Sequence, residues 1–200
     1  MKEGIIYKRN VHRPFHIYIG HTYFISGRTY KGYTYFSSEE RRKFFCKKLG
    51  ELAKEMHIVL FAYVVLENHY HVLFSLYSQD ELAFVTPKER SKGDNKGEKM
   101  VRFIRRLHTI TAKKLNDEDH MRGRTVWYQY WDYCVRNKAD FWSHFNYIIK
   151  NPYKHGLVES LDEAYSYIYS SNPVWLKRFG KDGLWESFVR YPVTEVAPVE

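Results

Sequence analysis

The sequence predicts an α+β domain built around an antiparallel sheet. Three observations lead to this prediction. Hydrophobic patterns typical of strands and of helices alternate along the chain, a two-residue turn joins two of the strand-like segments, and 44% of the residues are hydrophobic, which is enough for a packed core. The length of 200 residues suits one domain with a short appendage.

The first half of the domain begins with a strand and a helix. Residues 21–29 are rich in Thr, Tyr, Phe and Ile, which favours a strand. Ser37 and Glu40 then have the spacing of a capping box, so we expect a helix to begin there. The apolar face of this helix recurs at the helical period and consists of Phe45, Leu49, Leu52 and Met56.

A hairpin is expected next. Residues 58–66 form a continuous apolar run, which predicts a buried strand, and the turn at 67–68 interrupts it. Residues 69–77 then alternate between two sides, which places His69 and His71 together on one of them. The apolar side, which should face the helices, consists of Tyr70, Val72, Phe74 and Leu76.

The second half repeats this order. We expect a polar, Gly- and Lys-rich loop at 86–98, a helix at 100–115, a second loop at 116–125 and an aromatic strand at 126–136. Asn137 can cap a further helix over 138–151, which should end near Pro152 and Gly156. The complete order is β–α–β–β–α–β plus one helix, the ferredoxin-like, split βαβ plan. We expect its sheet to carry both helices on one face and to leave the other face free.

Composition narrows the class of partner. Lys and Arg number 32 and Asp and Glu 23, so the formal charge is +9, and 18% of the residues are aromatic. A basic, aromatic-rich chain favours a polyanion such as nucleic acid, although the charge could simply keep the protein soluble. The chain has no apolar run of membrane-spanning length and no signal-peptide pattern. Its two cysteines, Cys46 and Cys134, have no zinc-site spacing and fit a reducing cytosol.

Two short patterns could carry chemistry. The first is His69-Tyr70-His71, which sets two imidazoles on one side of a strand, where they could hold a divalent metal. Two ligands are not a complete site, and two surface histidines are the commoner reason for this spacing.

The second pattern lies on the helix 138–151. Asp140, His144, Tyr147 and Asn151 fall on one face, which could simply be the polar face of an amphipathic helix. Alternatively, Tyr147 is a nucleophile and Asn151 an oxygen ligand. A phenol has a pKa of about 10, so its attack needs help, which a metal beside the target phosphate could give.

Three segments together resemble the single-tyrosine HUH transposases, and more closely their REP-associated tyrosine transposase branch. They are AYVVLENHYHVLF (62–74), VWYQYWDYCVRN (126–137) and NYIIKNPYKHGLV (146–158). The ordered combination is far more specific than any one motif. The resemblance divides the chain into a single-tyrosine HUH transposase domain over 1–160 and a C-terminal extension over 161–200.

The resemblance implies cleavage and rejoining of hairpin-bearing single-stranded DNA. The family's paired histidines correspond to His69 and His71, its nucleophilic tyrosine to Tyr147, and its polar metal ligand to Asn151. It implies a covalent 5′-phosphotyrosine, with Mg²⁺ or Mn²⁺ polarising the phosphate and without ATP or a small-molecule cofactor. It also implies a cytoplasmic bacterial protein that joins the nucleoid when bound to DNA. It favours a monomer and leaves open the dimer that related transposases form.

Other polar side chains are further candidates. His144 could position a ligand or the DNA, or be a solvated helix residue. The stripe of Arg102, Arg105, Arg106 and Lys113 could follow phosphates or be a solvated helix face, and Lys150 and Lys154 could also contact DNA.

Two departures from the family pattern leave other functions open. Tyr70 is bulkier than the usual residue between the histidines, and Glu67 stands where many relatives have proline. The alternatives are a domesticated relative that binds hairpin DNA without turnover and a small HUH replication initiator. The loop 78–98 and the extension resemble lineage-specific additions.

Overall fold

The computed structural model describes residues 22–76 and 96–193. The beginning of the chain, most of the expected loop 86–98 and the end of the extension lie outside these ranges. Where the description resumes, helix α4 (Lys96–Glu118) begins four residues earlier than the expected Met100. The apolar pattern that located this helix starts at Met100, whereas its polar first turn carries no such signal.

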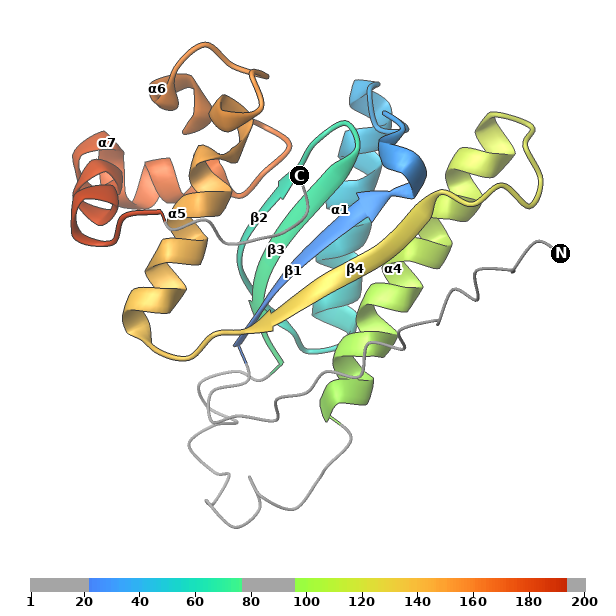
Figure 1. Cartoon of the computed structure of the whole chain (residues 1–200), viewed down its shortest axis with the longest axis horizontal. Coiled ribbons are helices and arrows are strands. Elements are labelled where there is room, and N and C mark those ends of the chain that lie inside the picture. The colour runs from blue at the N-terminus through green and yellow to red at the C-terminus, as the bar shows by residue number, and fades with distance from the viewer. Residues whose placement is uncertain (1–21, 77–95, 194–200) are drawn as a thin grey trace, which may run out of the picture.

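Four antiparallel strands form one sheet. They are β1 (Thr22–Thr29), β2 (Val59–Val65), β3 (His69–Ser75) and β4 (Trp127–Cys134), in the order β2-β3-β1-β4. This order confirms the split βαβ plan, because the strands adjacent in sequence, β2 and β3, pair as a hairpin while β1 lies between β3 and β4. A short 3₁₀ turn, η1 (Tyr30–Gly32), follows β1 (Figure 1).

One face of the sheet is covered by α1 (Glu39–Glu55) and α4, as expected. The cap of α1 is Ser38, one residue after the predicted Ser37, and its side chain accepts a hydrogen bond from the Arg41 amide. The predicted side of β3 packs here, since Tyr70, Val72, Phe74 and Leu76 all belong to this core.

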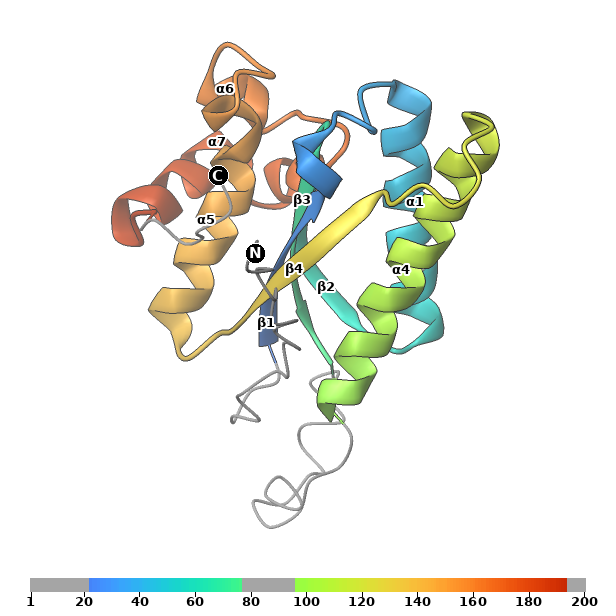
Figure 2. The same ribbon diagram turned by 45° about the vertical axis from the view of Figure 1, so that its right-hand side comes forward.

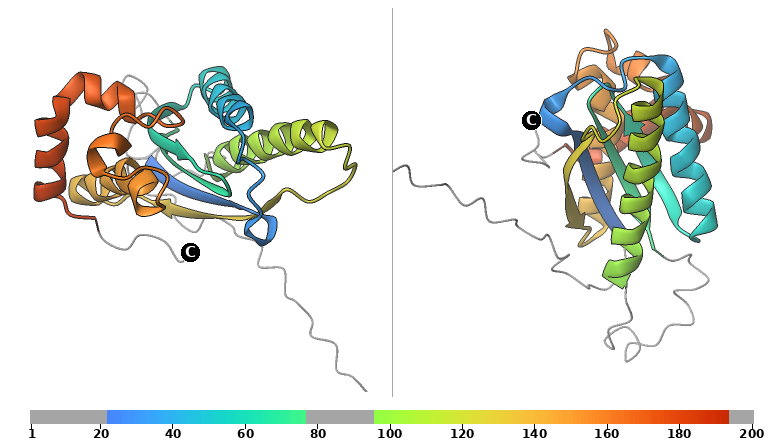
Figure 3. Two further views of the ribbon diagram at one scale, coloured as in Figure 1. Left: turned by 90° about the horizontal axis from the view of Figure 1, so that it is seen from above. Right: turned by 90° about the vertical axis from the view of Figure 1, so that its right-hand side faces the viewer.

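The other face is not free, which corrects the expectation from the sequence. Helix α5 (Lys138–Lys154) lies across it with α6 (Leu161–Ala164) and α7 (Asn172–Arg190) beside α5 (Figure 2). The view from above shows the sheet between two helical layers (Figure 3). The cause is a second apolar core, in which Phe24 and Leu73 of the sheet meet side chains of α5 and of the extension.

Helix α5 begins as predicted and ends one turn later. The Asn137 side chain accepts a hydrogen bond from the Asp140 amide, which caps the helix. Pro152 lies within the last turn rather than beyond it, and the helix closes at Gly156, whose φ of +66° suits a residue without a side chain. The additional turn carries Lys154 and His155 to the end of the site described below.

The extension is fixed to the domain by buried polar contacts. The Asn172 side chain donates to the Ile149 carbonyl of α5 (3.0 Å) and to the Ala164 carbonyl of α6 (2.7 Å). Trp175 donates to the Phe61 carbonyl of β2. Within the ranges the structure describes, no helix is both long and apolar enough to cross a membrane.

Candidate active site

The site begins with the strand alternation that turns His71 away from α1 and α4. His71 is opposite Ser26 of β1 and Val64 of β2, so it lies in the middle of the sheet. Only 2% of its surface is exposed. Its ring lies on that of Phe24, with centroids 5.4 Å apart, under helix α5.

His69 lies beside His71 on the same face, with ring centroids 5.1 Å apart. Its Nδ1 is 2.7 Å from Oδ1 of Asn68, so this nitrogen carries the proton and Nε2 is left for another partner. The Asn68 amide nitrogen donates to the Gly32 carbonyl at 3.2 Å, which fixes the orientation of its oxygen. A histidine whose second nitrogen is held in this way is prepared to bind a metal.

Helix α5 places Tyr147 directly over His71. The rings of Tyr147 and His71 meet in a T-shaped contact with centroids 5.0 Å apart. Tyr147 also contacts Phe24 at 5.9 Å, and the Lys154 ammonium lies over its ring at 5.2 Å. Tyr147 therefore lies beside His71, between the sheet and the end of α5.

Asn151, one turn after Tyr147, is completely buried. Neither its amide nitrogen nor its carbonyl oxygen has a hydrogen-bond partner of good geometry. The same is true of both ring nitrogens of His71 and of the Ser26 hydroxyl opposite it. Buried polar atoms are nearly always paired, so such a group of unpaired atoms indicates a site built for a ligand.

His144, one turn before Tyr147, is buried rather than solvated. Its Nδ1 is 2.7 Å from the Asp140 carbonyl, and its ring lies against Tyr133 and Phe24 with centroids 4.7 and 4.8 Å away. These contacts stabilise the start of α5 on the sheet. Its expected role in positioning a ligand or DNA stays a prediction.

Burial determines the protonation state of the site. It lowers the pKa of His69 to about 3, with further contributions from His155, Arg28 and Lys154. It also holds the pKa of His71 well below its usual value. Both rings are therefore neutral at pH 7, the form that binds metal ions. Burial raises the pKa of Tyr147, and the neighbouring Asn151 offsets part of this rise, so the phenol is protonated at neutral pH.

The donor set fits a divalent metal only if Asn151 takes part. Among the described residues, no group of three or more His, Cys, Asp or Glu side chains is arranged to hold a metal ion. The sequence predicts His69, His71 and Asn151 as the ligands, and the unpaired atoms of His71 and Asn151 are of the types that such a site uses. A role of these three residues in holding a metal stays a prediction.

The residues that the sequence predicts to contact DNA lie on helices that cover opposite faces of the sheet. Arg102, Arg105, Arg106 and Lys113 lie on α4, which covers the sheet face opposite the histidines. Arg106 is in a two-point ion pair with Glu55, at 2.6 and 3.0 Å. Lys150 and Lys154 lie on α5, and Lys154 reaches Tyr147. A DNA role for any of these residues stays a prediction.

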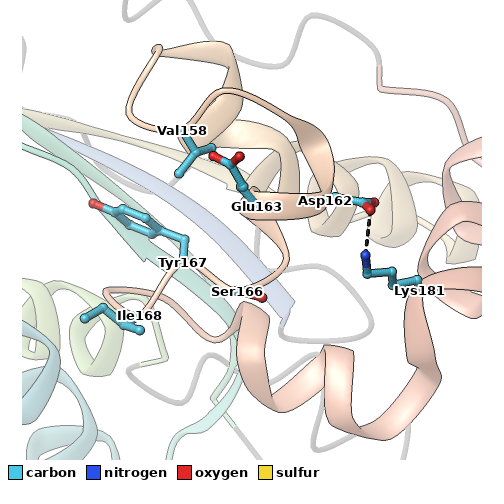
Figure 4. Close-up of a pocket in the computed structure, with 7 residues that line it drawn as sticks. All are labelled: Val158, Asp162, Glu163, Ser166, Tyr167, Ile168 and Lys181. Carbon is cyan, nitrogen blue, oxygen red and sulfur yellow. Dashed lines mark hydrogen bonds and ion pairs between the residues drawn. The ribbon is translucent and has the colours of Figure 1, made fainter.

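A pocket of about 470 Å³ lies elsewhere, between α6 and α7 (Figure 4). Its polar lining includes Asp162, Glu163 and Lys181, and Asp162 pairs with Lys181 at 2.6 Å. None of the histidines or Tyr147 lines it. Its acidic side chains do not suit a polyanion.

Sequence reasoning missed two residues of the site. Asn68 was assigned only to the turn, although it directly precedes His69. His155 lies 4.6 Å from His69 between ring centroids. Extending the stripe of Tyr147 and Asn151 by one more turn of α5 would have found His155.

Comparisons with known proteins support the fold. No protein-family model and no curated protein sequence matches this chain. It is similar to the solved structure of a REP-associated tyrosine transposase bound to a REP hairpin, with a TM-score of 0.52 and 20% identity, over 100% of this chain and 94% of that one. The structure of a candidate transposase from Deinococcus radiodurans R1 gives a TM-score of 0.41 at 17% identity, over 68% of this chain and 88% of that one.

Proposed function

We propose that this protein is a metal-dependent single-stranded DNA transposase that cleaves and rejoins hairpin-bearing DNA through a covalent 5′-phosphotyrosine. The observation that carries the proposal is the contact between Tyr147 and His71, beside the unpaired donor atoms of His71 and Asn151. The shared fold with a transposase that is bound to a REP hairpin supports the choice of substrate.

The reaction is a transesterification. The Tyr147 oxygen attacks the scissile phosphorus and loses its proton to solvent, and the bond from phosphorus to O3′ breaks. The departing O3′ takes up a proton and becomes a free 3′-hydroxyl. Rejoining is the reverse attack of a 3′-hydroxyl on the phosphotyrosine. One phosphodiester replaces another at each step, so no ATP is needed.

His69, His71 and Asn151 would hold the metal, Mg²⁺ or Mn²⁺. When bound, it supplies positive charge that polarises the phosphate and stabilises the negative charge of the transition state. Asn68 would keep His69 in the binding tautomer through the 2.7 Å hydrogen bond. Packing of Tyr147 between Phe24 and His71 would restrict the position of its ring.

A single copy is sufficient for this chemistry. His71 and Tyr147 come from β3 and α5 of the same chain, so no second copy has to donate the tyrosine helix. We therefore propose a monomer that acts on DNA in the bacterial cytoplasm.

The test is covalent capture of DNA. The protein is incubated with a pool of labelled hairpin oligonucleotides whose single-stranded flanks are randomised, with Mn²⁺ or with EDTA. We expect denaturation-resistant adducts only with Mn²⁺, carrying the label when it is on the 3′ side of the cut. Tyr147→Phe should give none, because it lacks the nucleophilic oxygen.

Two results would contradict the proposal. Adducts formed equally by Tyr147→Phe would exclude this nucleophile. Binding of hairpins by the folded wild-type protein, with no adduct from any member of the pool, would favour the relative that binds DNA without turnover.

A further inference from the structure

Two neighbouring tyrosines, the half-buried Tyr30 of η1 and the exposed Tyr128 of β4, lie at the η1 end of the sheet. Tyr128 of β4 is 59% exposed, and its ring lies 6.5 Å from that of Tyr30, between centroids. Thr29 pairs with Trp127 across the sheet, next to a register shift between Gly27 and Thr29, so the residues that follow them, Tyr30 and Tyr128, come close together. Large aromatic rings usually bury most of their surface, so the exposed ring of Tyr128 requires an explanation.

Two cations accompany the rings. The Lys31 ammonium lies over the Tyr30 ring at 5.4 Å, and Arg28 pairs across the sheet with His69. Neither cation forms an ion pair with a described residue, whereas Arg41 and Arg106 on the opposite face are neutralised by acidic side chains. Positive charge is therefore available beside the rings. We call Arg28, Tyr30, Lys31 and Tyr128 the tyrosine platform.

The backbone of the platform is held in an uncommon conformation. Lys31 has a φ of +54°, in the left-handed region that residues with side chains rarely adopt. The Asn68 side chain holds the next residue through the Gly32 carbonyl and also holds His69. One amide thus joins the platform to the candidate metal site.

We propose that the tyrosine platform binds unpaired nucleotides that flank the hairpin and guides that strand toward Tyr147. The argument rests on the proposed function and specifies its substrate. Bases stack on exposed aromatic rings while nearby cations attract the phosphates, a combination that suits single strands.

The experiment measures binding in the Tyr147→Phe background, so cleavage does not interfere. The probes are a labelled hairpin with single-stranded flanks of about ten nucleotides, within the range that one binding domain covers, and the same hairpin without flanks. Tyr128→Ala should weaken binding of the flanked probe by about fivefold or more and leave the other probe unchanged. Tyr128→Phe keeps the ring and should behave like the parent.

A matched control excludes a general effect of losing surface aromatics. Trp185 on α7 is 58% exposed, so Trp185→Ala removes a comparably exposed ring from outside the platform. It should not change binding of either probe. A 2-aminopurine in the flank should lose fluorescence on binding, and Tyr128→Ala should restore that fluorescence, because stacking quenches it.

The proposal is overturned if Tyr128→Ala binds the flanked probe as the parent does, if Trp185→Ala weakens binding equally, or if flanks add no affinity. Concentration-dependent dimerisation that Tyr128→Ala abolishes, without an effect on DNA, would assign the platform to a second copy instead. Failure of the two proposals is distinguishable, since covalent capture tests Tyr147 and flank-dependent binding tests Tyr128.

Discussion

The rings of Tyr147 and His71 meet in a T-shaped contact, with centroids 5.0 Å apart and planes inclined by 79°. The two residues come from α5 and β3: β3 begins the second half of the split βαβ unit, and α5 follows that half. Their contact brings the proposed nucleophile to a pair of neutral imidazoles. It exists because α5 covers the face of the sheet that the βαβ plan alone would leave free.

Gly27 should be intolerant of a side chain. A Cβ at Gly27 would lie 2.2 Å from the ring of Tyr70, which is completely buried and cannot move away. Gly27→Ala should therefore lower the free energy of unfolding by about 1–3 kcal/mol, measured by urea denaturation. The matched control is Gly50→Ala in α1, where no atom lies within 4 Å and stability should rise by up to about 1 kcal/mol. Equal effects of the two substitutions would contradict the crowding at Gly27.

The Tyr70 hydroxyl should contribute to stability through His108. The two groups are 2.8 Å apart in the core under α4. Tyr70→Phe leaves the buried Nε2 of His108 without this partner, so the free energy of unfolding should fall by about 1–3 kcal/mol. Tyr128→Phe, which changes an exposed ring, should have no comparable effect. Unchanged stability of Tyr70→Phe would show that the hydrogen bond is not formed.

Stability should fall in acid, partly because of His108. Burial lowers the pKa of His108 to about 3, from 6.5, so the unfolded chain binds one more proton than the folded chain between these values. The contribution of His108 to the free energy of unfolding is fully present above pH 6.5 and decreases by about 1.4 kcal/mol for each pH unit below that value. The double variant Tyr70→Phe/His108→Leu removes both polar partners. Between about pH 6 and pH 4, its free energy of unfolding should therefore change less steeply with pH than that of the parent, by about 1.4 kcal/mol per pH unit. Identical slopes would mean that native His108 is protonated.

Asn68 should control metal affinity without being a ligand. Its oxygen fixes the tautomer of His69 at 2.7 Å. Asn68→Ala should weaken Mn²⁺ binding about 10- to 100-fold in isothermal titration calorimetry. The control is Asn116→Ala, which removes an amide that also donates to a backbone carbonyl, that of Arg124. A metal affinity reduced equally in both variants would indicate general destabilisation.

The order of elements and the side of β3 that carries His69 and His71 were predictable because both follow from local hydrophobic periods. The strand alternation that buries Tyr70 under α4 necessarily turns the histidines to the other face. The face stripe of α5 likewise predicted that Tyr147 and Asn151 lie together. These inferences need only the geometry of one strand and one helix.

The packing of α5, α6 and α7 over the site was not predictable in the same way. It depends on contacts distant in sequence, such as that of Asn172 with the Ile149 carbonyl, which no local pattern encodes. For the same reason, the sequence could not indicate that His144 is buried. The platform of Tyr30 and Tyr128 also requires the strand register, which brings together residues from β4 and η1.

The most direct test of the central claim is to locate the DNA on the protein. Trypsin cleaves after Lys138 and Lys150, so the peptide 139–150 contains Tyr147 as its only tyrosine, while the neighbouring Tyr153 falls in 151–154. After covalent capture with Mn²⁺, nuclease digestion and mass spectrometry, we predict a nucleotide mass on peptide 139–150. Tyr153→Phe should leave this result unchanged. A nucleotide found on another peptide, or no modified peptide from a protein that cleaves DNA, would contradict the account.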